Sequence, residues 1–127
     1  AENMVKEWQK SSKKLNAFLS HNKTDEINEN FSQLVEFINS KDNNPYIEAH
    51  HLIPMAAQGC FENTIDFADN IVTLCPNCHR KIHYVLPNER EEMIEVLYIK
   101  REKLYSQYGI RVDKQMLMNF YGINKID

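Results

Sequence analysis

The sequence predicts an α+β fold that is mostly helical and forms one domain, because 127 residues are too few for two independent cores. Apolar residues make up 43% of the chain and charged residues 26%, the balance of a globular rather than a disordered protein. With only three glycines and four prolines, an all-β fold with frequent turns is not expected. Segments of helical periodicity surround two short segments with strand-forming composition.

Two helices are predicted at the start of the chain. Apolar residues recur with helical spacing over residues 4–19 and again over 27–38. Thr24 or Asp25 is suitably placed to cap the second helix. We therefore expect N-terminal helices within residues 1–40.

A strand–loop–strand–helix segment is predicted next. Residues 46–53 and 71–74 are rich in strand-forming side chains. Pro76 stands where the first residue of a helix is expected, and this helix continues through His83. The order defines a central ββα core over residues 46–85.

Helices are expected again over residues 88–122. A long helix runs from about Glu89 to Tyr108 and ends at Gly109, and Asp113 caps a short helix over residues 114–121. The inward side of the long helix is predicted to carry Met93, Val96, Leu97 and Leu104.

Four of the five histidines lie between residues 50 and 83. His79 and His83 are four residues apart on the predicted helix, so their imidazoles share one face and suit one metal ion. His50 and His51 are neighbours on a strand and point to opposite faces, so one can bind metal while the other acts as a base. Three imidazole ligands leave positions open for water and substrate, as in a catalytic metal site.

These residues carry a resemblance to a known family. The stretches YIEAHHLIPM (46–55) and DNIVTLCPNCHRKIH (69–83) together resemble the HNH endonuclease motif of the ββα-metal nucleases, and especially its McrA-like restriction subgroup. The resemblance implies a ββα-metal finger at the centre of a single HNH nuclease domain spanning residues 1–127. It also implies hydrolysis of phosphodiester bonds.

The resemblance assigns a role to each residue of the motif. His51 corresponds to the general base and His50 to a metal ligand. Asn70 corresponds to the middle asparagine, whose amide would hold the loop that bears the base. His79, the final histidine of the motif, would be a catalytic residue and a metal ligand, and His83 would be the third ligand.

The metal itself stays open between magnesium, manganese, nickel and zinc. Imidazoles favour the transition ions whereas magnesium prefers oxygen, and His50 stands where many relatives have an aspartate. Glu48 lies two residues before His50 and so on the same strand face. It is either a partner of the ligands or a solvated strand residue.

The cysteines allow two interpretations. An odd count of three, without an export signal, does not favour a disulfide scaffold. In many relatives a second Cys-x-x-Cys completes a structural zinc site with the pair that corresponds to Cys75 and Cys78, but here no cysteine precedes Cys60. Either Cys60 and His21 complete a structural zinc site, or the pair is buried without metal.

The formal net charge of −3 argues against a nuclease that binds DNA through a broad basic surface. Residues 75–111, however, hold seven Lys and Arg against five acids. Arg80 and Lys81 are candidate phosphate contacts beside the ligand histidines, and solvated helix charges are the alternative.

The expected function is that of a metal-dependent HNH endonuclease acting on double-stranded DNA, in restriction of foreign or modified DNA. The alternatives are a zinc-stabilised DNA-binding or interaction module without cleavage, and an RNA-cleaving or toxin nuclease on the same scaffold. No stretch reaches the roughly 20 apolar residues of a membrane span. A cytoplasmic protein of bacterial or phage origin is expected. Its acidic balance and its first residue, Ala1, suggest a recognition domain or partner subunit outside these residues.

Overall fold

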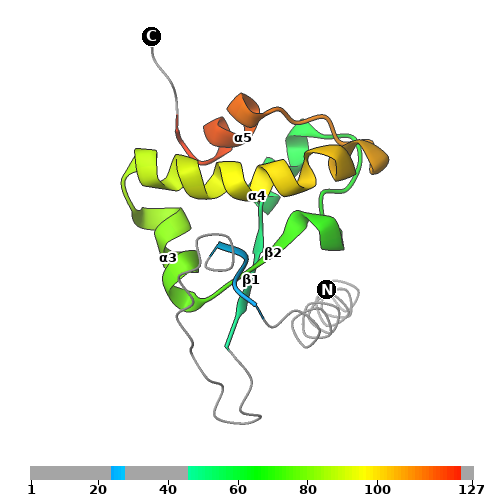
Figure 1. Cartoon of the computed structure of the whole chain (residues 1–127). Helices are drawn as coiled ribbons and strands as arrows, with labels where there is room; N and C mark the ends of the chain where they lie inside the picture. Colours follow the sequence, from blue (N-terminus) through cyan, green and yellow to red (C-terminus); the bar gives the residue numbers. More distant parts are fainter. Residues whose placement is uncertain (1–23, 28–45, 124–127) are drawn as a thin grey trace, which may run out of the picture.

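The computed structural model describes residues 24–27 and 46–123 (Figure 1). The elements are β1 (Glu48–His51), the 3-10 helices η1 (Met55–Cys60) and η2 (Ala68–Asn70), β2 (Ile71–Leu74), and the helices α3 (Pro76–Tyr84), α4 (Pro87–Gln107) and α5 (Lys114–Phe120). Helices around a two-stranded antiparallel sheet confirm the α+β class. Apart from residues 24–27, the N-terminal helices predicted within residues 1–40 lie outside the described residues.

The two strands pair in antiparallel fashion, with Glu48 opposite Leu74 and His51 opposite Ile71. β1 ends at His51, two residues earlier than the end of the predicted strand. The strand stops there because the next two main-chain N–H groups donate to Asn70. Leu52 N donates to the main-chain oxygen of Asn70 at 2.9 Å, and Ile53 N donates to the side-chain oxygen of Asn70 at 2.9 Å. The segment between the strands, predicted to be irregular, contains η1 and η2.

α3 begins as predicted, with Pro76 in its first turn. Cys75 is the N-cap, and its Sγ accepts a hydrogen bond from Cys78 N at 3.4 Å. Cys78 and Ile82 are buried, and α3 packs against both strands. The two histidines of α3, His79 and His83, lie outside this buried face and point toward His50 of β1.

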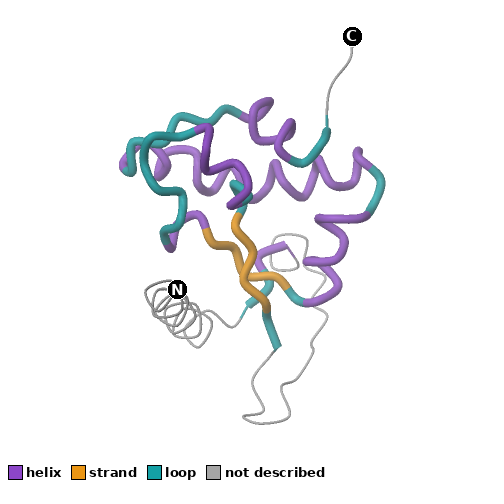
Figure 2. Tube along the Cα trace, turned by 180° about the vertical axis from the view of Figure 1, so that it is seen from behind, coloured by secondary structure: helices purple, strands orange, loops and turns teal. Residues whose placement is uncertain are grey.

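α4 lies between α5 on one side and α3 with η2 on the other (Figures 1 and 2). Met93 and Leu97 are buried as predicted, but Val96 and Leu104 are only half-buried. The buried positions of α4 are Met93, Ile94, Leu97, Tyr98, Arg101 and Tyr105. A helix packed on two sides buries a wider face than the single stripe that periodicity indicates. Gly109 ends this segment with φ of 71°, the left-handed conformation expected of a glycine stop.

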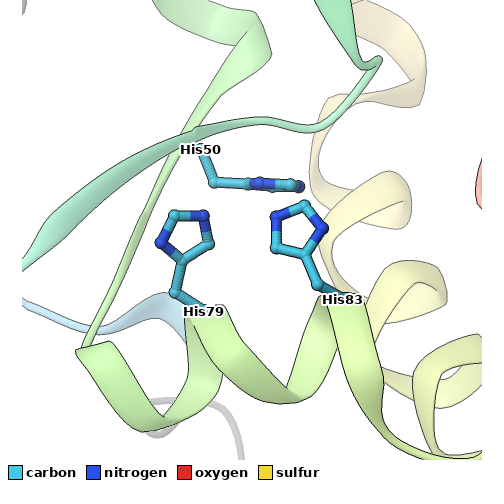
Figure 3. A group of neighbouring side chains, drawn as sticks. All are labelled: His50, His79 and His83. Carbon is cyan, nitrogen blue, oxygen red and sulfur yellow. The ribbon is translucent and has the colours of Figure 1, made fainter.

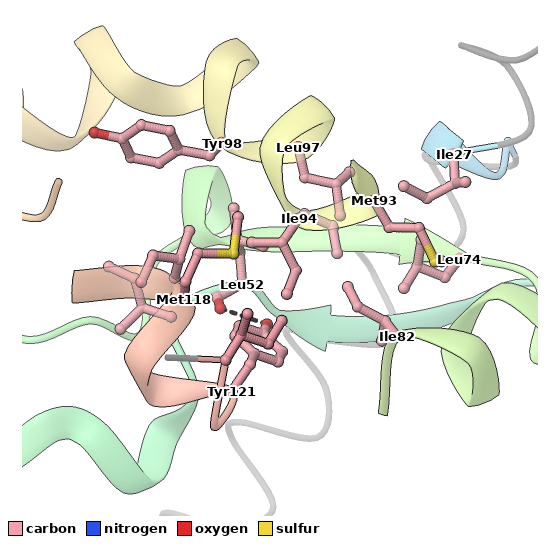
Figure 4. Packing of buried hydrophobic residues seen from close by; sticks show 14 of the residues in the cluster. Ile27, Leu52, Leu74, Ile82, Met93, Ile94, Leu97, Tyr98, Met118 and Tyr121 are labelled. Carbon is pink, nitrogen blue, oxygen red and sulfur yellow. Dashed lines mark hydrogen bonds between the residues drawn. The ribbon is translucent and has the colours of Figure 1, made fainter. Parts of the chain in front are cut away.

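The hydrophobic core lies where these elements meet (Figure 4). Leu74 of β2, Ile82 of α3, Leu97 of α4 and Met118 of α5 all belong to it and are almost fully buried. Asp113 caps α5, as predicted, by accepting from a main-chain N–H at 2.8 Å. Within the part of the chain that the structure describes, no helix has the length and apolar content needed to cross a membrane.

Residues 24–27 are tied to this core by polar contacts. Asp25 Oδ1 accepts from Ile27 N at 2.9 Å, the bond expected of a helix N-cap. Its other oxygen accepts from Cys75 N at 2.6 Å. Glu26 pairs with the buried Arg101 of α4 at 2.7 Å. Of the two caps that the sequence allowed, the structure selects Asp25.

Candidate metal and catalytic site

β1 and α3 bring three histidines together, and Figure 3 shows the ring of His50 facing those of His79 and His83. One ring nitrogen of each lies within 4.8 Å of those of the other two. The ring centroids are 5.2 Å apart for His50 and His79, 4.9 Å for His50 and His83, and 5.1 Å for the helical pair. Nitrogens that converge in this way can reach one ion, with bonds of about 2 Å, through small ring rotations.

The electrostatics of the cluster favour the neutral forms of His50 and His83. His50 is 6% exposed. Burial, reinforced by the imidazoles of His83 and His79, lowers the pKa of His50 to about 3. Burial, with the charges of His79 and Arg90, also lowers the pKa of His83. Metal binding requires deprotonated ligand nitrogens, so this donor set fits a divalent ion at neutral pH.

Glu48 lies beside this cluster. Its Oε1 is 3.5 Å from His79 Nδ1, a contact too long for a strong hydrogen bond but close enough for an electrostatic interaction. Its side chain is 37% exposed. The position agrees with the expectation that Glu48 shares the strand face of His50.

His51 is separate from the three-histidine cluster, as the alternation of side chains along a strand predicts. Its Nε2 lies 2.9 Å from Asp66 Oδ1. An ionised carboxylate only accepts hydrogen bonds, so Nε2 carries the hydrogen, and in the neutral imidazole Nδ1 is left with a free lone pair. Asp66 could not be predicted from the sequence, because an acid in an irregular segment 15 residues away carries no pattern that links it to His51.

Asn70 is completely buried and uses its whole side-chain amide. Nδ2 donates to the oxygens of Ile53 at 3.2 Å and Ile65 at 2.8 Å. Oδ1 accepts from Ile53 N at 2.9 Å and from the hydroxyl of Tyr105 at 2.8 Å. The predicted hydrogen bonds to the loop that follows His51 are therefore present. The catalytic consequence of this arrangement stays a prediction.

The cysteine pair, for which the sequence allowed either a zinc site with Cys60 and His21 or burial without metal, lies beside Asp25. Cys75 and Cys78 are buried and group with Asp25, with their donor atoms within 4.8 Å of one another. Cys60 does not join this group, because it lies in η1 and is exposed. Burial and the Asp25 carboxylate raise the pKa of both buried thiols. His21 lies outside the described residues.

An open pocket of about 460 Å³ adjoins the histidine cluster. It is lined by residues from the start of β1 and from α3, among them Tyr46, His79, Arg80, His83 and Tyr84. Arg80 thus lines a pocket beside the histidines, and its contact with phosphate stays a prediction. Lys81 is also exposed on α3 but is not part of the lining.

Comparison with known proteins shows which family this region resembles. The sequence model of the HNH endonuclease family matches residues 37–84, which include all four histidines and Asn70. One protein with a similar sequence is the "Type IV methyl-directed restriction enzyme EcoKMcrA" of Escherichia coli K12, which is 46% identical to this chain over 63 residues. The resemblance to the HNH endonucleases and their McrA-like members is thus confirmed.

That match covers 50% of this chain but only 20% of the relative. No solved structure matches the chain.

Proposed function

We propose that this chain is a metal-dependent HNH endonuclease that hydrolyses phosphodiester bonds of DNA. The observation that carries the proposal is the convergence of three imidazoles beside a fourth, separately oriented histidine. The family match over the same residues supports it. His50, His79 and His83 would hold one divalent ion, with Glu48 next to them. Such an ion polarises the scissile phosphate and stabilises charge on the leaving oxygen.

His51 is the proposed general base. Its Nδ1 lone pair takes the proton of the attacking water, while Nε2–H stays bonded to Asp66. The Asp66 carboxylate orients the ring and stabilises the imidazolium that forms. Asn70 holds the main chain that follows His51 and so limits the positions that this ring can take. The proposed base, His51, and one proposed ligand, His50, therefore lie on opposite faces of β1, while the other two proposed ligands come from α3.

All three candidate metals with affinity for imidazole, namely manganese, nickel and zinc, remain compatible with this donor set, and magnesium is the least suited. Among the residues that the structure describes, Asp25 and not Cys60 groups with the two thiols, so a structural zinc there would use Asp25. Both Asp25 oxygens already accept main-chain hydrogen bonds. We therefore favour a thiol pair without metal.

The proposed substrate is double-stranded DNA, with Arg80 in the pocket and Lys81 beside it as phosphate contacts. The printed name of the E. coli relative describes a methyl-directed restriction enzyme. By that similarity we propose a role in restriction of foreign or modified DNA in the bacterial cytoplasm. The net charge of −3 leaves little general affinity for DNA. We therefore propose that residues 1–127 form one catalytic domain and that a recognition domain or subunit supplies further binding.

The test is plasmid nicking by the wild type and His51→Ala, with magnesium, manganese, nickel or zinc and with a chelator control. We expect cleavage with at least one transition ion and a loss of about 10²–10⁴-fold in His51→Ala. Zinc titration should show that the variant still binds metal, since His51 is outside the cluster. Lys100→Ala, a change at an exposed residue of α4, is the matched control.

Three outcomes would contradict parts of the proposal. Equal nicking by His51→Ala would remove the base assignment. Absence of cleavage with every ion, despite metal binding, would favour the non-catalytic DNA-binding module. Parallel digestion of double-stranded DNA, single-stranded DNA and RNA tests the substrate, and faster cleavage of RNA would favour the toxin-nuclease alternative.

A further inference from the structure

Tyr121 connects the C-terminal end of α5 with His50 of β1 and with the main chain just after β1. Its phenol oxygen lies 2.7 Å from His50 Nε2 and 2.6 Å from the main-chain oxygen of Leu52. Figure 4 shows the bond to Leu52 inside the core. Tyr121 is 8% exposed, so both contacts are shielded from water. One hydroxyl therefore touches a proposed metal ligand and the residue that follows the proposed base.

The direction of these hydrogen bonds follows from counting hydrogens. The phenol has one hydrogen, and the carbonyl of Leu52 can only accept. If the phenol donated to His50, two oxygens without a hydrogen between them would lie 2.6 Å apart. The hydroxyl therefore donates to Leu52, and its oxygen accepts from His50, whose Nε2 must carry the hydrogen. In a neutral imidazole this leaves the lone pair on Nδ1.

Tyr121 is itself firmly held. Arg90 Nη2 donates to the main-chain oxygen of Tyr121 at 2.5 Å, and its Nε donates to Ile82 O at 3.1 Å. Ile82 precedes His83 on α3, so the same guanidinium ties Tyr121 to the helix that carries two of the proposed ligands.

We propose that Tyr121 is a positioning residue that fixes His50 as its Nε2–H tautomer and thereby presents Nδ1 to the metal ion. The proposal rests on the proposed function, because it takes His50 as a metal ligand. Partners of this kind orient metal-binding imidazoles, and their loss commonly weakens metal affinity by about 10–100-fold. The tautomer can be measured without metal or substrate, so it is independent of nuclease activity.

The experiment compares Tyr121→Phe with Tyr98→Phe. Tyr98 is the matched control, since it is also buried and its hydroxyl donates to a main-chain oxygen, that of Val112, at 2.8 Å. Both variants are expected to lower the melting temperature by similar amounts. Only Tyr121→Phe should weaken zinc binding, by about 10–100-fold in calorimetric titration with zinc alone.

Long-range ¹H–¹⁵N NMR of the metal-free wild type should show His50 protonated at Nε2, and Tyr121→Phe should show a mixture of tautomers. A wild-type His50 protonated at Nδ1 would overturn the inference even if Tyr121→Phe does not fold. Equal loss of zinc affinity in Tyr98→Phe would also overturn it, because the effect would then be general destabilisation. Failure of the wild type to bind any ion would instead contradict the proposed function, while the NMR result would still decide the tautomer.

Discussion

Replacing Asn70 by alanine should disrupt the loop that carries the proposed base. The side chain makes four hydrogen bonds, of 2.8–3.2 Å, in a site with no exposed surface. Alanine removes all of them and leaves three main-chain groups without these partners: the N–H and oxygen of Ile53 and the oxygen of Ile65. The hydroxyl of Tyr105 loses its acceptor as well.

The expected cost follows from these groups. A buried polar group that loses its partner costs about 1–3 kcal/mol. At the lower limit, because water can enter the space that is left, three main-chain groups give about 3 kcal/mol. That is a large part of a typical total stability of about 5–15 kcal/mol. For a denaturant slope of about 1.5 kcal/mol per molar urea, the unfolding midpoint should fall by about 2 M.

Urea unfolding followed by far-UV circular dichroism measures this change, and plasmid nicking below the transition measures its effect on His51. Asn63→Ala is the control, because Asn63 is exposed and its amide donates to Tyr108 O at 3.2 Å. That variant should lose less than about 0.5 kcal/mol. If Asn70→Ala lost less than about 1 kcal/mol, the amide would not be what holds this loop.

Two further predictions concern residues outside the proposed site. Arg101→Met should lower the free energy of unfolding by about 3 kcal/mol, because it leaves the largely buried carboxylate of Glu26 without its cation. Lys114→Met breaks an exposed ion pair and should cost less than about 1 kcal/mol. Equal urea midpoints for the two variants would refute this prediction. Iodoacetamide at pH 8 should label Cys60 in the native protein but Cys75 and Cys78 only after unfolding, because burial and a nearby carboxylate raise the pKa of both inner thiols. Peptide mass spectrometry measures the labelling, and equal modification of all three native thiols would contradict it.

The features that the sequence predicts correctly are local ones. Pro76 and the four-residue spacing of His79 and His83 define a helix and the face that carries both histidines within nine residues. Strand alternation separates His50 from His51 in the same way. These patterns depend only on the geometry of one element, so they can be read before the tertiary structure is known.

The partners that orient these side chains could not be predicted, because they come from distant segments. Asp66 reaches His51 from the segment between η1 and η2, and Tyr121 reaches His50 across 71 positions. The neighbour of the cysteine pair could not be predicted either, because Cys75 and Cys78 group with the distant Asp25 and not with Cys60. Periodicity describes which face of an element is buried, but not which residue of another element meets it.

The origin of these partners indicates that the helices after the family motif are part of the proposed catalytic unit. The HNH match ends at residue 84, yet Tyr105 completes the hydrogen bonds of Asn70 and Tyr121 those of His50. Each of these phenols replaces water at a buried polar group, which would otherwise cost about 1–3 kcal/mol. The same helices, α4 and α5, pack on the core that holds β1 and α3 together. Stability and ligand orientation therefore come from the same contacts, so a change in the packing of α5 should alter metal affinity although α5 supplies none of the proposed ligands.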